Sequence, residues 1–306
     1  MWVEAAAFVA TLPTVPESMF DPMGPVAAEQ KAHMIRVVLL TMIAIVPVLI
    51  GVPLLAWRYR RRPGSKAKYT PNWGFNGWLE LTMWGVPIAI IVVLAGALVY
   101  STKLLDPARP IGPEPMQVQA IGLNWKWVFI YPEQGVATID RLVIPVGRPV
   151  ELVMTSDTVM LSPMAAALSG QIYVMPGMVT RQNLQADRAG STTGRNMMYN
   201  GDGFADQAFT VDAVPAQAFK TWASAASGST VVLGAADYAR IAAPGTGEQA
   251  LKTLGLSDGA GGAMRLGDPA LFQQVVRRYH GATPITAEMQ PGTDRYDGGH
   301  EGGRAQ

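Results

Sequence analysis

Long apolar runs dominate the first third of the chain. The runs Val37–Trp57 and Leu81–Tyr100 contain no charged residue, and each offers about 20 apolar positions, enough to cross the hydrocarbon core of a bilayer. Neither run has the polar stripe at every third or fourth position that a helix on a soluble core carries. The pattern therefore predicts two membrane-spanning helices, and the prolines inside them predict kinks.

Beyond Tyr100 a proline-rich passage leads to Met116, where apolar and polar positions begin to alternate with a period of two. This alternation is typical of a half-buried β-strand. Further short β-rich runs follow, separated by Gly, Pro, Asp or Asn: Thr138–Pro145, Pro149–Thr155, Gln171–Met175, Met178–Gln185 and Phe209–Val214. Several short strands over about 100 residues predict one β-sandwich or barrel.

Helical patterns return after the strands. Pro215 precedes a predicted helix at Ala216–Ala226, a weaker helical pattern follows at Tyr238–Ala243, and Pro269–Tyr279 predicts another helix. The Gly-rich end of the chain predicts disorder. The predicted domains are an external N-terminal segment (1–32), a transmembrane hairpin (33–102), a linker (103–115), a β-sandwich (116–214), an α-helical extension (215–280) and a disordered tail (281–306).

The loop between the two apolar runs is basic and has no acid. Its cations are Arg58, Arg60, Arg61, Arg62, Lys66 and Lys68. Such a loop is retained in the cytoplasm by the positive-inside rule, which predicts that both termini and the β domain lie outside. Binding of nucleic acid is disfavoured, because the cluster adjoins a span and the formal net charge of the chain is only +1.

The chain has no cysteine, which excludes disulfides, iron–sulfur clusters and thiolate metal sites. The histidines, His33, His280 and His300, all lie outside the predicted sandwich. The 16 methionines are scattered at strand-like or loop spacing. Methionines in such positions more often fill gaps in a core or an interface than bind a metal.

The residues from about Asp21 to Val214 resemble the second subunit of haem-copper respiratory oxidases. The landmarks are Pro71-Asn72-Trp73, Glu80 with Trp84 and Pro87, Asn124-Trp125-Lys126-Trp127, Tyr131-Pro132-Glu133-Gln134-Gly135 and Gln171-Ile172-Tyr173. The stretch from Trp125 to Thr138 is similar to the quinol-oxidising branch, the cytochrome bo-type ubiquinol oxidases, more than to the cytochrome c-oxidising branch. The resemblance implies a cupredoxin-like sandwich and a role as subunit II of a proton-pumping ubiquinol oxidase in an aerobic respiratory chain.

In the cytochrome c branch the sandwich holds a dinuclear copper centre with cysteine, histidine and methionine ligands. By resemblance, the cysteine positions fall here at Asn196 and Asn200, the histidine positions at Leu161 and Phe204, and the methionine position at Gln207. Soft cuprous copper prefers thiolate and thioether ligands, whereas carboxamides are hard and weak ligands. The resemblance therefore implies that this chain binds no copper or other cofactor.

The resemblance also assigns candidate roles. Glu80 matches the second-subunit glutamate at the mouth of a proton-uptake channel of the large subunit, and the alternative is an interfacial acid paired with Lys66 or Lys68. Trp125 and Trp127 are expected to pack and to contact the large subunit. Trp84 is a further candidate for the subunit interface.

The implied complex contains the catalytic residues, the haems and the oxygen-reducing copper in subunit I, and none in this chain. Subunits III and IV, membrane lipid and ubiquinol complete the expected partners. The expected location is the bacterial inner membrane, with the β domain and both termini in the periplasm.

The chain departs from the family at Leu161–Leu168, where the quinol branch carries an aromatic-rich stretch with an arginine at the position of Ala167. The lipid-modified cysteine common near the start of bacterial relatives is also absent. An alternative is therefore a membrane-anchored cupredoxin-like binding or assembly protein that is no longer part of an oxidase. A cytochrome c oxidase subunit is opposed by every ligand position.

Overall fold

The structure, a computed structural model, describes residues 12–60, 72–256 and 262–281. The chain forms two compact units, one of residues 29–106 and the other of residues 1–28 together with 107–306. The predicted basic residues Arg61, Arg62, Lys66 and Lys68 lie outside the described residues, as do residues 282–306 of the predicted disordered tail.

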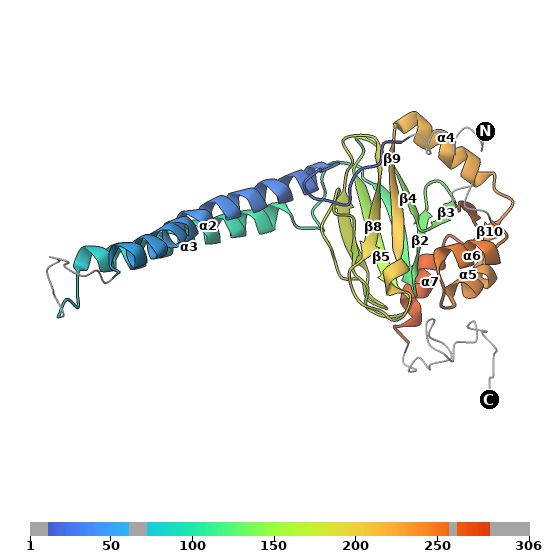
Figure 1. The fold of residues 1–306 in the computed structure, drawn as a ribbon. Helices are drawn as coiled ribbons and strands as arrows, with labels where there is room; N and C mark the ends of the chain where they lie inside the picture. Colours follow the sequence, from blue (N-terminus) through green and yellow to red (C-terminus); the bar gives the residue numbers. More distant parts are fainter. Residues whose placement is uncertain (1–11, 61–71, 257–261, 282–306) are drawn as a thin grey trace. The chain divides into compact units, whose positions relative to one another are not determined.

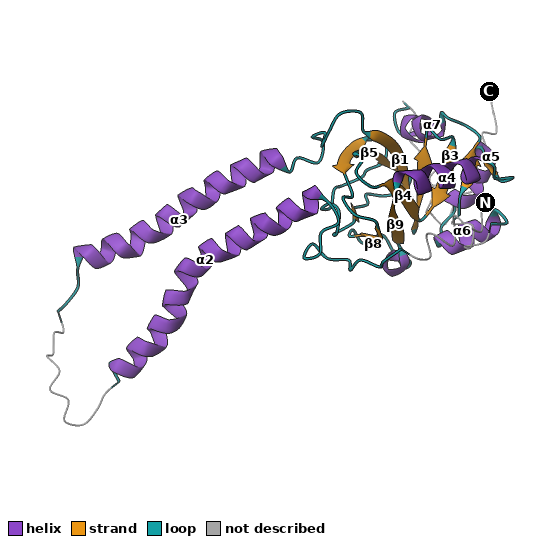
Figure 2. Cartoon of the chain, turned by 90° about the horizontal axis from the view of Figure 1, so that it is seen from above, coloured by secondary structure: helices purple, strands orange, loops and turns teal. Residues whose placement is uncertain are grey.

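The smaller unit is built on two long helices, α2 (Pro25–Arg58) and α3 (Gly77–Leu104). Their most apolar windows have mean hydropathies of 2.7 and 2.3, so both helices are long and apolar enough to cross a membrane, as predicted. Figure 2 shows that α2 bends along its length, and Pro47 and Pro53 lie inside it. A hydrogen bond of 2.8 Å between His33 Nδ1 and Ser101 Oγ joins the two helices.

The larger unit is a β-sandwich with attached helices (Figure 1). Its strands are β1 (Met116–Leu123), β2 (Lys126–Tyr131), β3 (Val136–Ile139), β4 (Arg141–Pro145), β5 (Val150–Ser156), β6 (Pro163–Met164), β7 (Thr180–Leu184), β8 (Gly190–Asn196), β9 (Ala208–Val214), β10 (Val232–Leu233) and β11 (Met264–Leu266). One sheet has the order β10-β11-β3-β2-β1-β5-β7 and the other β4-β9-β8-β6. The pairs β1–β5 and β4–β9 are parallel, whereas β1–β2 and β8–β9 are antiparallel.

Both faces of the larger sheet are covered. Trp127, Phe129 and Tyr131 of β2 pack in the core between the two sheets. Val128 and Ile130 of the same strand pack in a second core, formed with the helices α5 (Ala235–Ala242), α6 (Gly247–Thr253) and α7 (Leu271–Arg278). Figure 1 shows these helices in orange and red on one side of the strands. The alternation seen in the sequence of β2 therefore separates two cores and not a core from solvent.

The helix α4 (Ala216–Ser227) packs on the core that lies between the two sheets. Its Phe219 and Trp222 are buried, and Tyr131 contacts the Trp222 ring at 5.1 Å between centroids. The predicted helical extension is thus confirmed, and residues of α4, α5, α6 and α7 enter the two cores.

The N-terminal segment belongs to the sandwich. Val15 and Met23 lie in its core, and Thr14 pairs with Ser191 of β8. The ion pair Glu17–Arg195, with 2.7 Å between Oε2 and Nε, fastens the segment further. The helix α2 already begins at Pro25, because proline suits the first helical position, so the predicted boundary at residue 32 falls inside this helix.

Several predicted strands differ in the structure. The run Thr138–Pro145 is divided between β3 and β4, which belong to different sheets, because Asp140 has a φ of 51° and turns the chain. The run Gln171–Met175 forms only an isolated bridge, between Val174 and Leu161. The strand β8 and the helix α6 were not predicted.

Candidate functional site

Three of the five positions aligned with copper ligands come together at one end of the sandwich. Asn196 ends β8, Gln207 precedes β9, and Asn200 lies on the loop between them. The Nδ2 atoms of Asn196 and Asn200 both donate to Gln207 Oε1, at 3.0 and 2.7 Å. We call Asn196, Asn200 and Gln207 the amide cluster.

The amide cluster is joined to the surrounding backbone. Gln207 Nε2 donates to the carbonyl of Leu123 at 2.9 Å, which connects the cluster to β1. Asn196 Oδ1 accepts from the backbone N–H groups of Ser162 and Met198, at 2.9 and 3.1 Å. Asn196 and Gln207 thus each hold a further segment of chain, whereas the side chain of Asn200 bonds only to Gln207 and its buried Oδ1 has no partner among the described residues.

The two positions aligned with histidine ligands, Leu161 and Phe204, lie in different surroundings from each other. Leu161 is fully buried and exchanges backbone hydrogen bonds of 2.9 and 2.8 Å with Val174. Phe204 begins the short 3₁₀-helix η1 (Phe204–Asp206), and its ring meets the exposed Tyr199 edge-on at 5.6 Å between centroids. Neither side chain enters the hydrogen bonds of the amide cluster.

The paired tryptophans have different roles. Trp127 has no exposed surface and meets Phe209 edge-on at 5.9 Å, so the packing expected of it is seen in the core between the two sheets. Trp125 is half-buried and donates from Nε1 to the carbonyl of Asn200 at 3.1 Å. A Cβ at Gly203 would lie 2.2 Å from Trp125 Cδ2, so only glycine allows the indole to lie against this loop.

The altered segment Leu161–Leu168 lies mostly inside the unit. Ala165, Ala167 and Leu168 are buried, and the carbonyl of Ala167 accepts from the N–H of Met23 at 2.7 Å. The N-terminal segment therefore covers the position where the quinol branch carries its arginine. A large side chain at Ala167 would have to displace this segment.

Apart from Phe20 in the N-terminal segment, the exposed large apolar side chains among the described residues of the larger unit gather on three neighbouring loops. They are Val159, Met160, Tyr173, Met178, Val179, Met197 and Tyr199, and we call them the apolar loop surface. Backbone hydrogen bonds between Leu161 and Val174, and from Met197 N–H to the carbonyl of Ser162, join the loops. No charged residue occurs from Thr158 to Thr180, and exposed apolar patches of this kind mark interaction surfaces.

Glu80 and Trp84 lie one turn apart near the start of α3. Trp84 Nε1 donates to Glu80 Oε2 at 3.2 Å. Asn76 caps the helix, because its Oδ1 accepts from the N–H groups of Trp78 and Leu79. The carboxylate therefore stands in the first helical turns, where the helix dipole favours a negative charge.

Two buried ionisable groups that hold the helical extension were missed by the sequence analysis, as was the buried Asp212, which pairs with Arg141. Lys126 is 1% exposed, and its Nζ donates to the carbonyls of Asn124, Ala243 and Gly245, at 3.0, 2.9 and 2.7 Å. Burial lowers the pKa of Lys126 to about 8, and Asp140 acts in the opposite direction. The other group is Asp157, which has no exposed surface. The only sequence signal for either residue is a charge that interrupts an apolar stretch.

Comparison with known proteins identifies clear relatives, although no family model matches the chain. The chain is 38% identical over 229 residues to the cytochrome bo(3) ubiquinol oxidase subunit 2 of Pseudomonas putida, which covers 74% of this chain and 73% of the relative. It is 37% identical over 230 residues to the ubiquinol oxidase subunit 2 of Acetobacter aceti, covering 74% and 75%. It is 38% identical over 210 residues to the quinol oxidase subunit 2 of Bacillus subtilis, covering 67% and 65%.

Among solved structures, the periplasmic domain of subunit II of cytochrome oxidase of Bradyrhizobium japonicum is similar to 36% of this chain. The match covers 91% of that domain, with 19% identity and a TM-score of 0.35.

Proposed function

This chain belongs to the family of ubiquinol oxidase subunits 2, and we propose that it is the non-catalytic second subunit of a proton-pumping ubiquinol oxidase. In this proposal a partner haem-copper subunit oxidises the quinol and reduces oxygen, and subunits III and IV complete the complex. The hairpin of α2 and α3 anchors the chain in the bacterial inner membrane. Arg58 and Arg60 then lie on the cytoplasmic side and the sandwich in the periplasm.

The observation that carries the proposal is the chemistry of the amide cluster. A dinuclear copper centre needs soft sulfur ligands and imidazoles, and the aligned positions offer only carboxamides and apolar side chains. The amide N–H groups of Asn196 and Asn200 are engaged with Gln207, and Gln207 itself is held to β1. These residues do not fit the copper centre. A sandwich without copper suits an enzyme whose reductant is a quinol dissolved in the membrane, because electrons need not enter through a water-facing domain.

The apolar loop surface supports the assignment as a subunit. By resemblance, the loops near the aligned ligand positions face the large subunit. Five of its seven exposed apolar side chains lie in the stretch Thr158–Thr180, which has no charged residue, and such a surface is poorly suited to water and well suited to burial in a subunit interface.

Glu80 is proposed to stand at the entrance of a proton-uptake channel of the partner subunit. Its position in the first turns of α3 and its hydrogen bond from Trp84 support this role, because both keep the carboxylate in one orientation near the end of a span. An ionisable residue at such a place in a membrane helix usually marks a function or a partner.

Purification of the full chain in mild detergent, from cells that express the whole oxidase, tests the proposal. We expect a haem-bearing large subunit to co-purify, with no copper beyond that of this partner. If no haem protein co-purifies, the chain is not an oxidase subunit and the alternative of an assembly or binding protein is favoured. Two copper ions bound to the purified chain alone would overturn the assignment to the quinol branch.

A further inference from the structure

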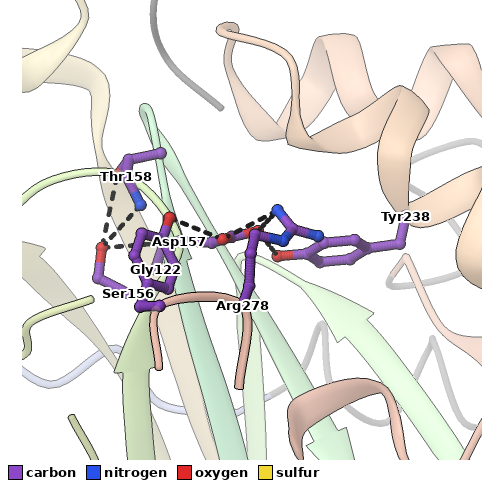
Figure 3. A network of polar contacts seen from close by, with 7 residues as sticks. Gly122, Ser156, Asp157, Thr158, Tyr238 and Arg278 are labelled. Atoms are coloured by element: carbon purple, nitrogen blue, oxygen red, sulfur yellow. Dashed lines mark hydrogen bonds and ion pairs between the residues drawn. The ribbon is translucent and has the colours of Figure 1, made fainter. Parts of the chain in front are cut away.

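A buried carboxylate connects the end of β5 to the C-terminal helices (Figure 3). Asp157 follows β5 directly and accepts two hydrogen bonds from Arg278 Nη1, at 2.8 Å to Oδ2 and 3.1 Å to Oδ1. Tyr238 of α5 donates to Oδ2 at 2.7 Å, and Tyr279 donates to Oδ1 at 2.9 Å. Residues 81 to 122 positions from Asp157 in the chain thus meet at one carboxylate.

Burial and these partners act in opposite directions on the ionisation of Asp157. Burial raises the pKa of Asp157, whereas the Arg278 guanidinium and the two tyrosine hydroxyls act in the opposite direction. Burial also raises the pKa of Tyr238 well above its ordinary value, so its hydroxyl remains a donor. Removal of one partner from a buried ion pair is strongly destabilising, because the other charge is left uncompensated.

Asp157 begins the first loop of the apolar loop surface. Its N–H donates to the carbonyl of Gly122 at 3.0 Å, and the adjacent Ser156 Oγ donates to the carbonyl of Val159 at 2.6 Å. The carboxylate and the backbone around it are therefore fixed together. The exposed Val159 and Met160 follow immediately.

The same C-terminal segment also holds the second loop. His280 Nε2 donates to the carbonyl of Gly177, and Tyr279 packs so closely that a Cβ at Gly177 would lie 2.7 Å from Tyr279 Cβ. Gly177 has a φ of +73°, which favours glycine in any case. The exposed Met178 and Val179 come next in the chain.

We propose that Arg278, Tyr279 and His280 form a clasp that holds the two loops at Asp157–Met160 and Met175–Val179 in the conformation needed to associate with the haem-bearing subunit. The clasp residues are positioning residues, since they fix the loops that carry the contact and are not themselves required to make it. This inference rests on the proposed function for the identity of the partner. It gives the C-terminal extension a function beyond covering the outer face of the sheet, because α7 positions the clasp residues next to the loops.

The test compares two neighbouring arginines in the full chain. Arg278→Gln removes the counter-charge of Asp157, and Arg277→Gln is the matched control, because Arg277 is exposed on the same helical turn. Hydrogen–deuterium exchange is followed at the hydrogen-bonded amides of Asp157, Leu161 and Val174. We expect exchange about ten-fold faster in Arg278→Gln, equivalent to about 1.4 kcal/mol of local stability, with the amides of β1 and β2 unchanged.

A second pair of variants probes the other loop without changing a charge. Gly177→Ala introduces a Cβ against Tyr279, and Gly147→Ala is its control, because Gly147 has a similar φ of +77° but open space around it. The haem-bearing subunit retained per chain after dilution in mild detergent is measured for all four variants. Arg278→Gln and Gly177→Ala should lose most of it, and both controls should match the unmodified protein.

The outcomes distinguish the claim that the clasp holds the loops from the claim that the held loops are needed for association. Unchanged loop exchange in Arg278→Gln and Gly177→Ala overturns the clasp. Faster loop exchange with full retention of the haem-bearing subunit shows that the loops are held but are not needed for association, and also overturns the proposal. If the unmodified chain itself retains no haem-bearing subunit, the proposed function fails and the association step fails with it, while the exchange data still decide whether the clasp holds the loops.

Discussion

Replacing the buried ammonium of Lys126 by a thioether tests how the helical extension is held to the sandwich. Lys126→Met keeps the unbranched shape of the side chain but removes hydrogen bonds to three carbonyls, two of them in the connection between α5 and α6. Hydrogen bonds from a charged donor contribute about 1.5–3 kcal/mol each, so their loss costs about 6 kcal/mol in total. The variant also escapes part of this cost, because burial disfavours the ammonium, as its lowered pKa indicates. The expected net loss in the free energy of unfolding is a few kcal/mol near neutral pH.

The pH dependence of the free energy of unfolding takes its sign from the direction in which the pKa of Lys126 is shifted. The pKa of Lys126 is lowered from 10.5 to about 8 in the folded chain. The unfolded chain therefore binds more protons between these pH values, and the stability of the unmodified protein rises with pH across that interval. Lys126→Met lacks this rise, so its deficit should widen by about 3 kcal/mol between pH ~8 and pH ~10.5.

Denaturant unfolding of the full chain in detergent micelles, followed by tryptophan fluorescence, measures both quantities. The matched control is Lys220→Met on α4, because Lys220 is exposed, and its effect should stay within about 0.5 kcal/mol. A loss for Lys126→Met below about 1 kcal/mol would refute the role of the three carbonyls. A deficit that stays constant as the pH rises would refute burial as the dominant influence on this amine.

Three other outcomes follow from the described contacts. Gln207→Leu removes the shared acceptor of Asn196 and Asn200 and should lower the free energy of unfolding by about 2–3 kcal/mol, measured by the same denaturant method; an unchanged value would mean that water replaces the cluster without cost. Glu80→Gln should slow oxygen consumption and proton uptake in the intact oxidase while the complex still assembles, and unchanged turnover would reduce Glu80 to an interfacial acid. Arg278→Gln leaves Asp157 with a further raised pKa, so its stability deficit should shrink as the pH is lowered and the carboxyl is protonated; a deficit independent of pH would show that packing and not charge is lost.

The membrane hairpin could be predicted from sequence because the constraint is local. A span must bury every backbone polar group within itself, so its composition alone identifies it. The strand β1 was equally readable, since Met116, Val118 and Ala120 are buried while Gln117 and Gln119 remain partly exposed. Both predictions depend on neighbours in the sequence and not on the rest of the fold.

The strand β8 shows why other elements could not be predicted. Its sequence Gly-Ser-Thr-Thr-Gly-Arg-Asn has no apolar alternation, because other segments fill the space beside it. A Cβ at Gly194 would lie 2.2 Å from the ring of Phe209, and one at Gly190 would lie 2.9 Å from Val15. Here the core-facing positions must be small, and the hydrophobic residues that complete the pattern come from β9 and the N-terminal segment.

The candidate sites also divide into those that the sequence could predict and those that it could not. The amide cluster could be found by matching residues to a family, and three of the five aligned positions do meet. The contact between Asp157 and Arg278 joins residues 121 positions apart and depends on where α7 packs, which no periodicity reveals. The core position of Trp127 depends on a similar long-range contact, because an aromatic residue in a matching motif can serve a partner or a core, and here the second sheet covers it.

The amide cluster also explains how a sandwich end without metal ligands can stay ordered. Gln207 connects the cluster, since it accepts hydrogen bonds from Asn196 and Asn200 and donates one to the carbonyl of Leu123. Metal ligands on the same loops would join the same segments through one ion. Hydrogen bonds are weaker individually, at about 0.5–1.5 kcal/mol net, so several must act together to give a comparable constraint. Because β1, β8 and the loop at Ser162 all meet at this cluster, the cluster also stabilises the conformation of the neighbouring apolar loop surface. The shape of that surface therefore depends on the amide cluster as well as on the clasp.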